Sequence, residues 1–136
     1  MIEQAGYSGT PLAKKLGIKD AAVLALLDAP AAWSVPELPS DVSVRRTVKT
    51  LAGIDVTLAF CRAPGDVAAL TALVESLPAR SALWVLWPRK AGGHVSDVDE
   101  NLLRSVLLST GVVDVKVAAV DTDWSGLKFV WRKENR

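Results

Sequence analysis

Stretches of apolar residues recur along the chain at lengths that suit β-strands. The stretch 21–27 is apolar throughout and is followed by Asp28, a pattern typical of a central strand that is covered on both faces. Apolar and polar residues alternate in 42–48 instead, which predicts a more exposed strand. The full set of predicted strands is 21–27, 42–48, 54–61, 82–87, 112–120 and 127–133.

Helical spacing of apolar residues predicts two helices in the first half of the chain. We expect Thr10 to cap a short first helix, Pro11 to occupy its first position, and Gly17 to end it in a left-handed turn. A second helix is expected after Pro64 and ends at Pro78, because proline cannot continue a helix.

Polar residues and glycine mark the third helix and the loops. Ser96 is expected to cap the third helix, with Asp99 as its capping-box partner, and Gly111 is expected to end it. The segment 29–40 contains too many prolines for a helix. The segment 6–9 is expected to form an ordered loop.

The order of the predicted elements indicates a fold class. From residue 54 onward, strands and helices alternate, which builds a parallel sheet covered by helices. The last two strands form a hairpin, and the order from residue 54 onward, a little over half the chain, resembles the second half of a class I methyltransferase domain. We therefore predict one α/β domain over residues 1–136. Its fold would be three-layer and Rossmann-like, with a degenerate class I methyltransferase-like mixed sheet and a closing antiparallel hairpin.

The first half of the chain departs from the methyltransferase pattern. Folds that bind dinucleotides or a methyl donor need a glycine-rich turn after the first strand, because the backbone must approach the cofactor closely. Here the strand leads into the segment 28–33, and no glycine occurs between Gly17 and Gly53. We therefore expect no cofactor. The link 48–54 is too short for a crossover helix, so an antiparallel second strand is a further expectation.

Three short segments together resemble a known family. They are YSGTPLAKKLGI at 7–18, WVLWPRK at 84–90 and WSGLK at 124–128. On these residues the chain resembles an uncharacterised bacterial family, domain of unknown function 3052, over nearly its whole length. The resemblance implies a family and a fold, but it implies no reaction and no catalytic residues.

Charge and composition narrow the classes of function. The net charge is +1 and the basic residues are spread along the chain, which argues against nucleic acid as a partner. Cys61 is the only cysteine, which fits a reducing compartment. No signal peptide is recognisable and no apolar run could span a bilayer. We expect a cytoplasmic protein without membrane contacts, and without a metal because the sequence has no metal-ligand spacing.

Ligands of open parallel sheets bind outside the carboxyl ends of the strands. Those ends should bring tryptophans and a few charged groups to one edge, which suits a small-molecule cleft. No catalytic residue is assigned. The candidate ligand-binding residues are Asp28, Arg62, Trp87, Arg89, Lys90, His94, Asp121, Asp123, Trp124 and Ser125.

Some of these residues also have an ordinary structural interpretation. Trp124, expected in a turn, is either an exposed contact residue or a packed side chain. His94 is the only histidine and lies in a loop, where a histidine is commonly just exposed. Cys61 is either a thiol whose pKa the neighbouring Arg62 lowers, or a small buried hydrophobic residue.

The charged residues leave similar alternatives open. Arg89 and Lys90 could hold an anion near the start of the third helix, but the acids within 97–100 would repel phosphate there. Asp121 and Asp123 either form a carboxylate pair or simply stabilise a turn.

Two functions remain after these considerations. The leading hypothesis is a non-catalytic binding or regulatory domain on a methyltransferase-like scaffold, with a small molecule or another protein as its partner. The alternative is an enzyme, methyltransferase-like or another small-molecule transferase, with an atypical site at the carboxyl edge of the sheet. A homo-oligomer that uses exposed tryptophans is a third option.

Overall fold

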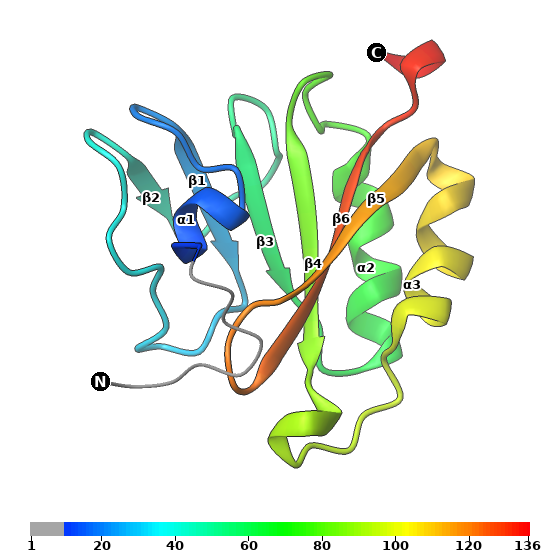
Figure 1. Cartoon of the computed structure of the whole chain (residues 1–136). Helices are drawn as coiled ribbons and strands as arrows, with labels where there is room; N and C mark the ends of the chain where they lie inside the picture. Colours follow the sequence, from blue (N-terminus) through cyan, green and yellow to red (C-terminus); the bar gives the residue numbers. More distant parts are fainter. Residues whose placement is uncertain (1–9) are drawn as a thin grey trace.

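The computed structural model describes residues 10–136, so the loop expected at 6–9 lies outside the described part. The described residues form a six-stranded sheet in the order β2-β1-β3-β4-β6-β5 (Figure 1). The strands are β1 (Val23–Leu27), β2 (Ser43–Arg45), β3 (Val56–Phe60), β4 (Ala82–Pro88), β5 (Val112–Ala119) and β6 (Trp124–Trp131). The helices are α1 (Leu12–Lys15), α2 (Pro64–Val74) and α3 (Glu100–Leu107), with short 3₁₀ turns η1 (Lys90–Gly92), η2 (Leu108–Thr110) and η3 (Lys133–Asn135).

The strand directions confirm the predicted class. β1 pairs in parallel with β2 and β3, and β3 pairs in parallel with β4. β6 runs antiparallel to both β4 and β5, so the closing antiparallel hairpin is present. The chain therefore folds into a Rossmann-like mixed sheet.

The second strand corrects the expectation of an antiparallel direction, because β2 runs parallel to β1. β2 is also much shorter than 42–48, and all its residues are exposed. A strand of this length rises only about 10 Å. The segment 46–55 is therefore long enough to return to the start of β3 without a helix, since an extended residue spans about 3.3 Å or slightly more.

Different structures cover the two faces of the sheet. α2 and α3 lie side by side on one face (Figure 1). On the other face, α1 packs through Leu12 and Leu16, and the loop 28–42 packs through Val35. The fold thus has three layers, one of which is mostly loop. The buried residues of α2 are Val67, Leu70 and Val74, as the apolar spacing predicts.

The start of α1 differs from the prediction. α1 begins at Leu12, with Pro11 in the N-cap position and no side-chain cap, so the expected cap by Thr10 is wrong. Gly17 adopts a φ of 80°, which confirms the left-handed turn after the helix.

α3 begins later than the predicted cap at Ser96. Its N-cap is Asp99, whose Oδ1 accepts a hydrogen bond from the backbone N–H of Leu102 at 2.9 Å. The hydroxyl of Ser96 accepts instead from the backbone N–H of Val98 at 3.1 Å. Because Val98 is buried in the core beneath α3, the chain must reach it before the helix can begin.

β6 begins earlier than predicted because Gly126 lies inside the strand, where it pairs with Leu86. A Cβ at position 126 would lie 3.2 Å from Cε3 of the buried Trp84 and 3.1 Å from Cγ2 of Val120. The glycine therefore makes room for Trp84 rather than forming a turn, and the hairpin connection shrinks to 120–123.

Candidate functional site

The carboxyl ends of β1, β3 and β4 meet at one edge of the sheet, the lower edge in Figure 1. β1 and β3 are neighbours there, yet the chain visits β2, on the far side of β1, between them. The strand order thus reverses between β1 and β3, and such a switch point is where ligands of open α/β sheets bind.

Aromatic side chains occupy this switch point. Phe60, the last residue of β3, makes edge-to-face contacts with Trp33 and Trp124, each with ring centroids 4.9 Å apart. Trp33 comes from the loop after β1, and its indole N–H donates to Oδ2 of Asp121 at 2.9 Å. We call Trp33, Phe60 and Trp124 the aromatic plug.

Arg62 covers the plug from the end of β3. Its guanidinium carbon lies 5.2 Å from the ring centroid of Trp124, within the range of a cation–π contact. One of its Nη1–H groups donates to the backbone carbonyl of Asp28 at 2.9 Å. Asp28 has a φ of 56°, so the chain turns sharply where a cofactor loop would begin.

Trp124 is a packed side chain, because only 8% of its surface is exposed. It lies in β6 rather than in a turn. The interpretation of Trp124 as an exposed contact residue is therefore wrong, and the packing alternative is confirmed.

The turn 120–123 is fastened to the loop that follows β4. The backbone N–H of Arg89 donates to the carbonyl of Asp123 at 2.8 Å, and Nε2 of His94 lies 2.9 Å from Oδ1 of Asp123. Oδ1 of Asp121 accepts from the N–H groups of Asp123 and Trp124, so this aspartate stabilises the turn. The His94 side chain is exposed, so this contact adds little to stability.

An open pocket lies at the same edge, between the end of β4 and the start of α3. Its volume is about 340 Å³, which is near the small end of small-molecule sites. Four of the predicted residues line it: Trp87, Arg89, Lys90 and Ser125. We call it the β4 pocket; its other lining residues are Pro88, Ala91, Ser96, Val98 and Asp99.

Cys61 is a buried thiol rather than an activated one. Burial and, to a smaller extent, the nearby carboxylates of Asp66 and Asp28 raise its pKa, Arg62 lowers it only in part, and the net pKa is about 12. The predicted lowering by Arg62 is therefore wrong in its net sign. The interpretation as a small buried hydrophobic residue is confirmed.

The structure thus divides the ten predicted residues. Trp124 belongs to the aromatic plug, and Asp28, Arg62 and Asp121 lie around it. His94 and Asp123 join two loops, and the other four line the β4 pocket. Sequence reasoning missed Trp33 as a member of this edge, although it had noted the segment 28–33. It also missed Val98 as a lining residue, although it had placed the predicted helix start at Ser96 near Arg89 and Lys90.

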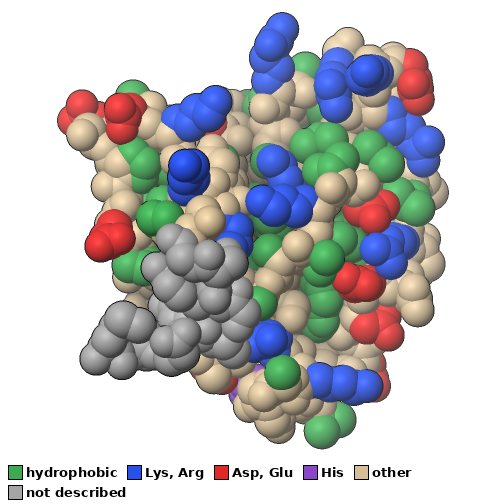
Figure 2. Space-filling view, viewed as in Figure 1, with side chains coloured by type: hydrophobic (Ala, Val, Ile, Leu, Met, Phe, Trp, Pro, Cys, Tyr) green, Lys and Arg blue, Asp and Glu red, His purple; other side chains and the backbone are tan. Residues whose placement is uncertain are grey.

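No cluster of three or more potential metal ligands occurs within residues 10–136. Over the same residues, no helix is long and apolar enough to cross a membrane. Lys and Arg side chains are spread from the upper to the lower part of the face in Figure 2 rather than gathered in one stripe.

Sheet order, parallel core and closing hairpin define a Rossmann-like α/β domain. The fold is similar to that of a SAM-dependent methyltransferase from Aquifex aeolicus, with a TM-score of 0.58 and 11% identity over 85% of both chains. It is also similar to a pericyclic reaction enzyme (TM-score 0.53, 11% identity, 90% of this chain) and to LepI in complex with SAM (TM-score 0.50, 10% identity, 82% of this chain). The chain spans only 47% and 36% of those two proteins.

At these identities the likeness shows a methyltransferase-like scaffold and nothing finer. The sequence itself matches no family model and no curated protein.

Proposed function

We propose that this chain is a non-catalytic binding or regulatory domain that uses a methyltransferase-like scaffold without its cofactor loop. The observation that carries the proposal is the aromatic plug at the switch point between β1 and β3. In this class of sheet a nucleotide-like group lies at that point and needs bare backbone after the first strand. Here the same position holds Trp33, packed on Phe60 and hydrogen-bonded to Asp121.

The residues around the switch point therefore do not fit an adenosyl group. The loop 28–42 contains no glycine, and β2 ends at Arg45, followed by Arg46, where an acidic side chain would bind ribose hydroxyls. Both departures from the cofactor-binding pattern favour a ligand that binds elsewhere on the molecule. This ligand is either a small molecule in the β4 pocket or another protein.

The proposal also includes a cellular location and a family for this chain. The lone cysteine supports a cytoplasmic protein. The segments 7–18, 84–90 and 124–128 support membership of the bacterial family known as domain of unknown function 3052.

The test is a binding and turnover experiment with S-adenosylmethionine (SAM). Isothermal titration of the full chain with SAM is expected to give no heat of binding. Incubation with radiolabelled SAM and a panel of nucleic-acid, protein and small-molecule acceptors is expected to transfer no methyl group. Saturable SAM binding together with methyl transfer to any acceptor would overturn the proposal.

One observation favours the second candidate, a methyltransferase-like or other small-molecule transferase with an atypical site. A SAM-dependent methyltransferase resembles this chain in fold over 85% of both chains. The same experiment separates the binding domain from a methyltransferase, because a methyltransferase must bind its methyl donor before it can transfer the group.

A further inference from the structure

We propose that the β4 pocket binds a small monocarboxylate, with the carboxylate group facing Arg89 and the apolar part of the ligand against Trp87. This inference rests on the proposed binding function and names the class of ligand. Three observations support it. A buried nitrogen of the Arg89 side chain has no hydrogen-bond partner among the described residues, and the Arg89 backbone is held by hydrogen bonds. The pocket walls combine positive charge with apolar surface.

Arg89 carries an incompletely solvated charge. Its Nη1 atom is buried and has no hydrogen-bond partner among the described residues, although buried donors of folded proteins are almost always paired. A guanidinium group that is shielded from water on one side, without a partner, attracts an anion more strongly than a hydrated one does. Nη1 itself is shut off from solvent, so an anion in the pocket would compensate the charge of the guanidinium group as a whole, through the part of this half-buried residue that lines the pocket.

The backbone of Arg89 is held by hydrogen bonds, so the point from which its side chain extends is fixed before any ligand arrives. Its backbone N–H donates to Asp123, and its carbonyl accepts from the N–H groups of Gly92 and His94. Gly92 lies so close to the turn 120–123 that a Cβ there would be 2.3 Å from the carbonyl oxygen of Thr122. Preorganised groups bind more tightly, because less freedom is lost on binding.

The walls of the pocket select the kind of anion. Arg89 and Lys90 provide positive charge, and the planar fork of a guanidinium group matches a carboxylate. Asp99 lies on the wall formed by the start of α3, and its negative charge disfavours a doubly charged phosphate. Trp87 and Val98 contribute apolar surface, which suits a ligand with a flat or apolar body.

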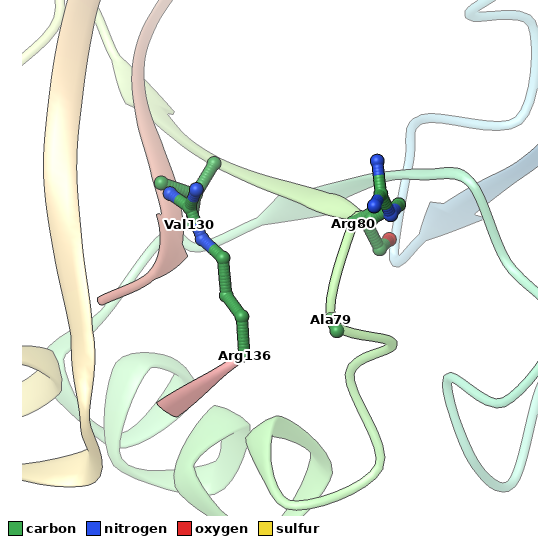
Figure 3. A pocket seen from close by; sticks show the side chains of 5 residues that line it. Ala79, Arg80, Val130 and Arg136 are labelled. Atoms are coloured by element: carbon green, nitrogen blue, oxygen red, sulfur yellow. The ribbon is translucent and has the colours of Figure 1, made fainter. Parts of the chain in front are cut away.

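The other arginine-lined pocket has a different character. It has a volume of about 530 Å³ and lies at the opposite edge of the sheet, beside the start of β4. In Figure 3, Arg136 reaches toward Val130, and Arg80 stands on the other side of the pocket. Both arginines are exposed, so water compensates their charge and no ligand is required. Arg80 is therefore a matched control for Arg89.

The experiment uses the full chain with benzoate as the probe, followed by backbone NMR at constant ionic strength. Benzoate is expected to shift the amide signals of Ser96, Val98 and Ser125 in a saturable way. Its neutral analogue benzamide and inorganic phosphate are expected to bind at least about tenfold more weakly, because each lacks one feature of the proposed ligand.

Two variants locate the binding group. Arg89→Met is expected to weaken benzoate binding about tenfold to a hundredfold, the effect of losing a hydrogen bond to a charged group. Arg80→Met is expected to leave it unchanged. Arg89→Met should also melt at the same or a higher temperature than the parent, because it removes an unpaired buried donor.

Absence of saturable benzoate shifts, or equal binding by the parent and Arg89→Met, would overturn the inference. A marked fall in the stability of Arg89→Met would also overturn it, because Arg89 would then have partners within the fold. None of these results bears on the absence of methyl transfer, so failure of the inference and failure of the proposed function are distinguishable.

Discussion

Cys61 shows how burial decides the chemistry of a single residue. The thiol is 1% exposed, and its pKa is raised from 9.0 to about 12. In the unfolded chain the thiol ionises near its ordinary pKa, whereas in the folded chain it stays neutral. The contribution of the neutral thiol to the free energy of unfolding is therefore complete below pH 9, and it is lost as the pH rises toward 12, the pKa in the folded chain.

We accordingly predict that the free energy of unfolding falls more steeply above pH 9 in the parent than in Cys61→Ala. The difference in slope should be about 1.4 kcal/mol per pH unit, the value for one proton. Denaturant titrations of both proteins between pH 8 and about 10.5 measure it. Cys61→Ala isolates the thiol, since all other groups titrate in both proteins.

Thiol labelling supplies a second measurement on the same residue. Ellman's reagent should modify the folded parent very slowly at pH 8 and rapidly in denaturant. Rapid labelling of the folded protein would contradict the burial argument and revive an activated thiol beside Arg62.

At the scale of elements, the contact between η1 and the turn 120–123 fixes two loops against each other at the carboxyl edge of the parallel strands. Gly92 packs against the backbone of Thr122, so a methyl group at 92 must push the two loops apart. We predict that Gly92→Ala lowers the free energy of unfolding by about 1–3 kcal/mol, the range for overpacking. Chemical denaturation measures this change.

Gly65→Ala is the matched control for that variant. Gly65 lies in the first turn of α2, and a Cβ there would meet nothing within 4 Å. Because alanine favours a helix over glycine by up to about 1 kcal/mol, this variant should be neutral or slightly more stable than the parent. If both variants lose the same free energy of unfolding, the close approach of Gly92 to Thr122 does not affect stability.

The elements also show where sequence patterns suffice. Apolar runs identified β1, β3 and β4 within a few residues, because these strands are buried on both faces. The start of β6 was missed because Gly126 looks like a turn residue in the sequence but makes room for Trp84 in the fold. The start of α3 was missed because the burial of Val98 is a tertiary effect that local capping rules do not contain.

At the scale of the whole molecule, the sequence predicted which residues come to the carboxyl edge but not what they do there. Strand ends are local features, and parallel strands carry them to one edge. The division into an aromatic plug and an open pocket depends instead on long-range contacts such as the hydrogen bond from Trp33 to Asp121. No local pattern in 28–33 indicates that Trp33 turns back over the sheet.

Trp33 connects this geometry to function, and its removal gives the last prediction. Trp33→Ala takes away the ring on Phe60 and leaves Asp121 without its indole donor. Because Trp33 is only partly buried, the loss of stability should be about 2–3 kcal/mol, below the range for fully buried aromatic residues. Trp33→Phe keeps a ring but loses the hydrogen bond, and should cost about 1 kcal/mol.

The Trp33→Ala variant also tests whether the aromatic plug alone excludes a nucleotide-like group from the switch point. Trp33→Ala opens the switch point, but side chains still line the segment 28–32 and no glycine is gained. If the missing cofactor loop is decisive, Trp33→Ala will still give no heat of binding with SAM. If SAM binds to Trp33→Ala and not to Trp33→Phe, the scaffold has kept a nucleotide site that one aromatic side chain blocks. The plug would then be a regulatory element rather than a replacement for the site.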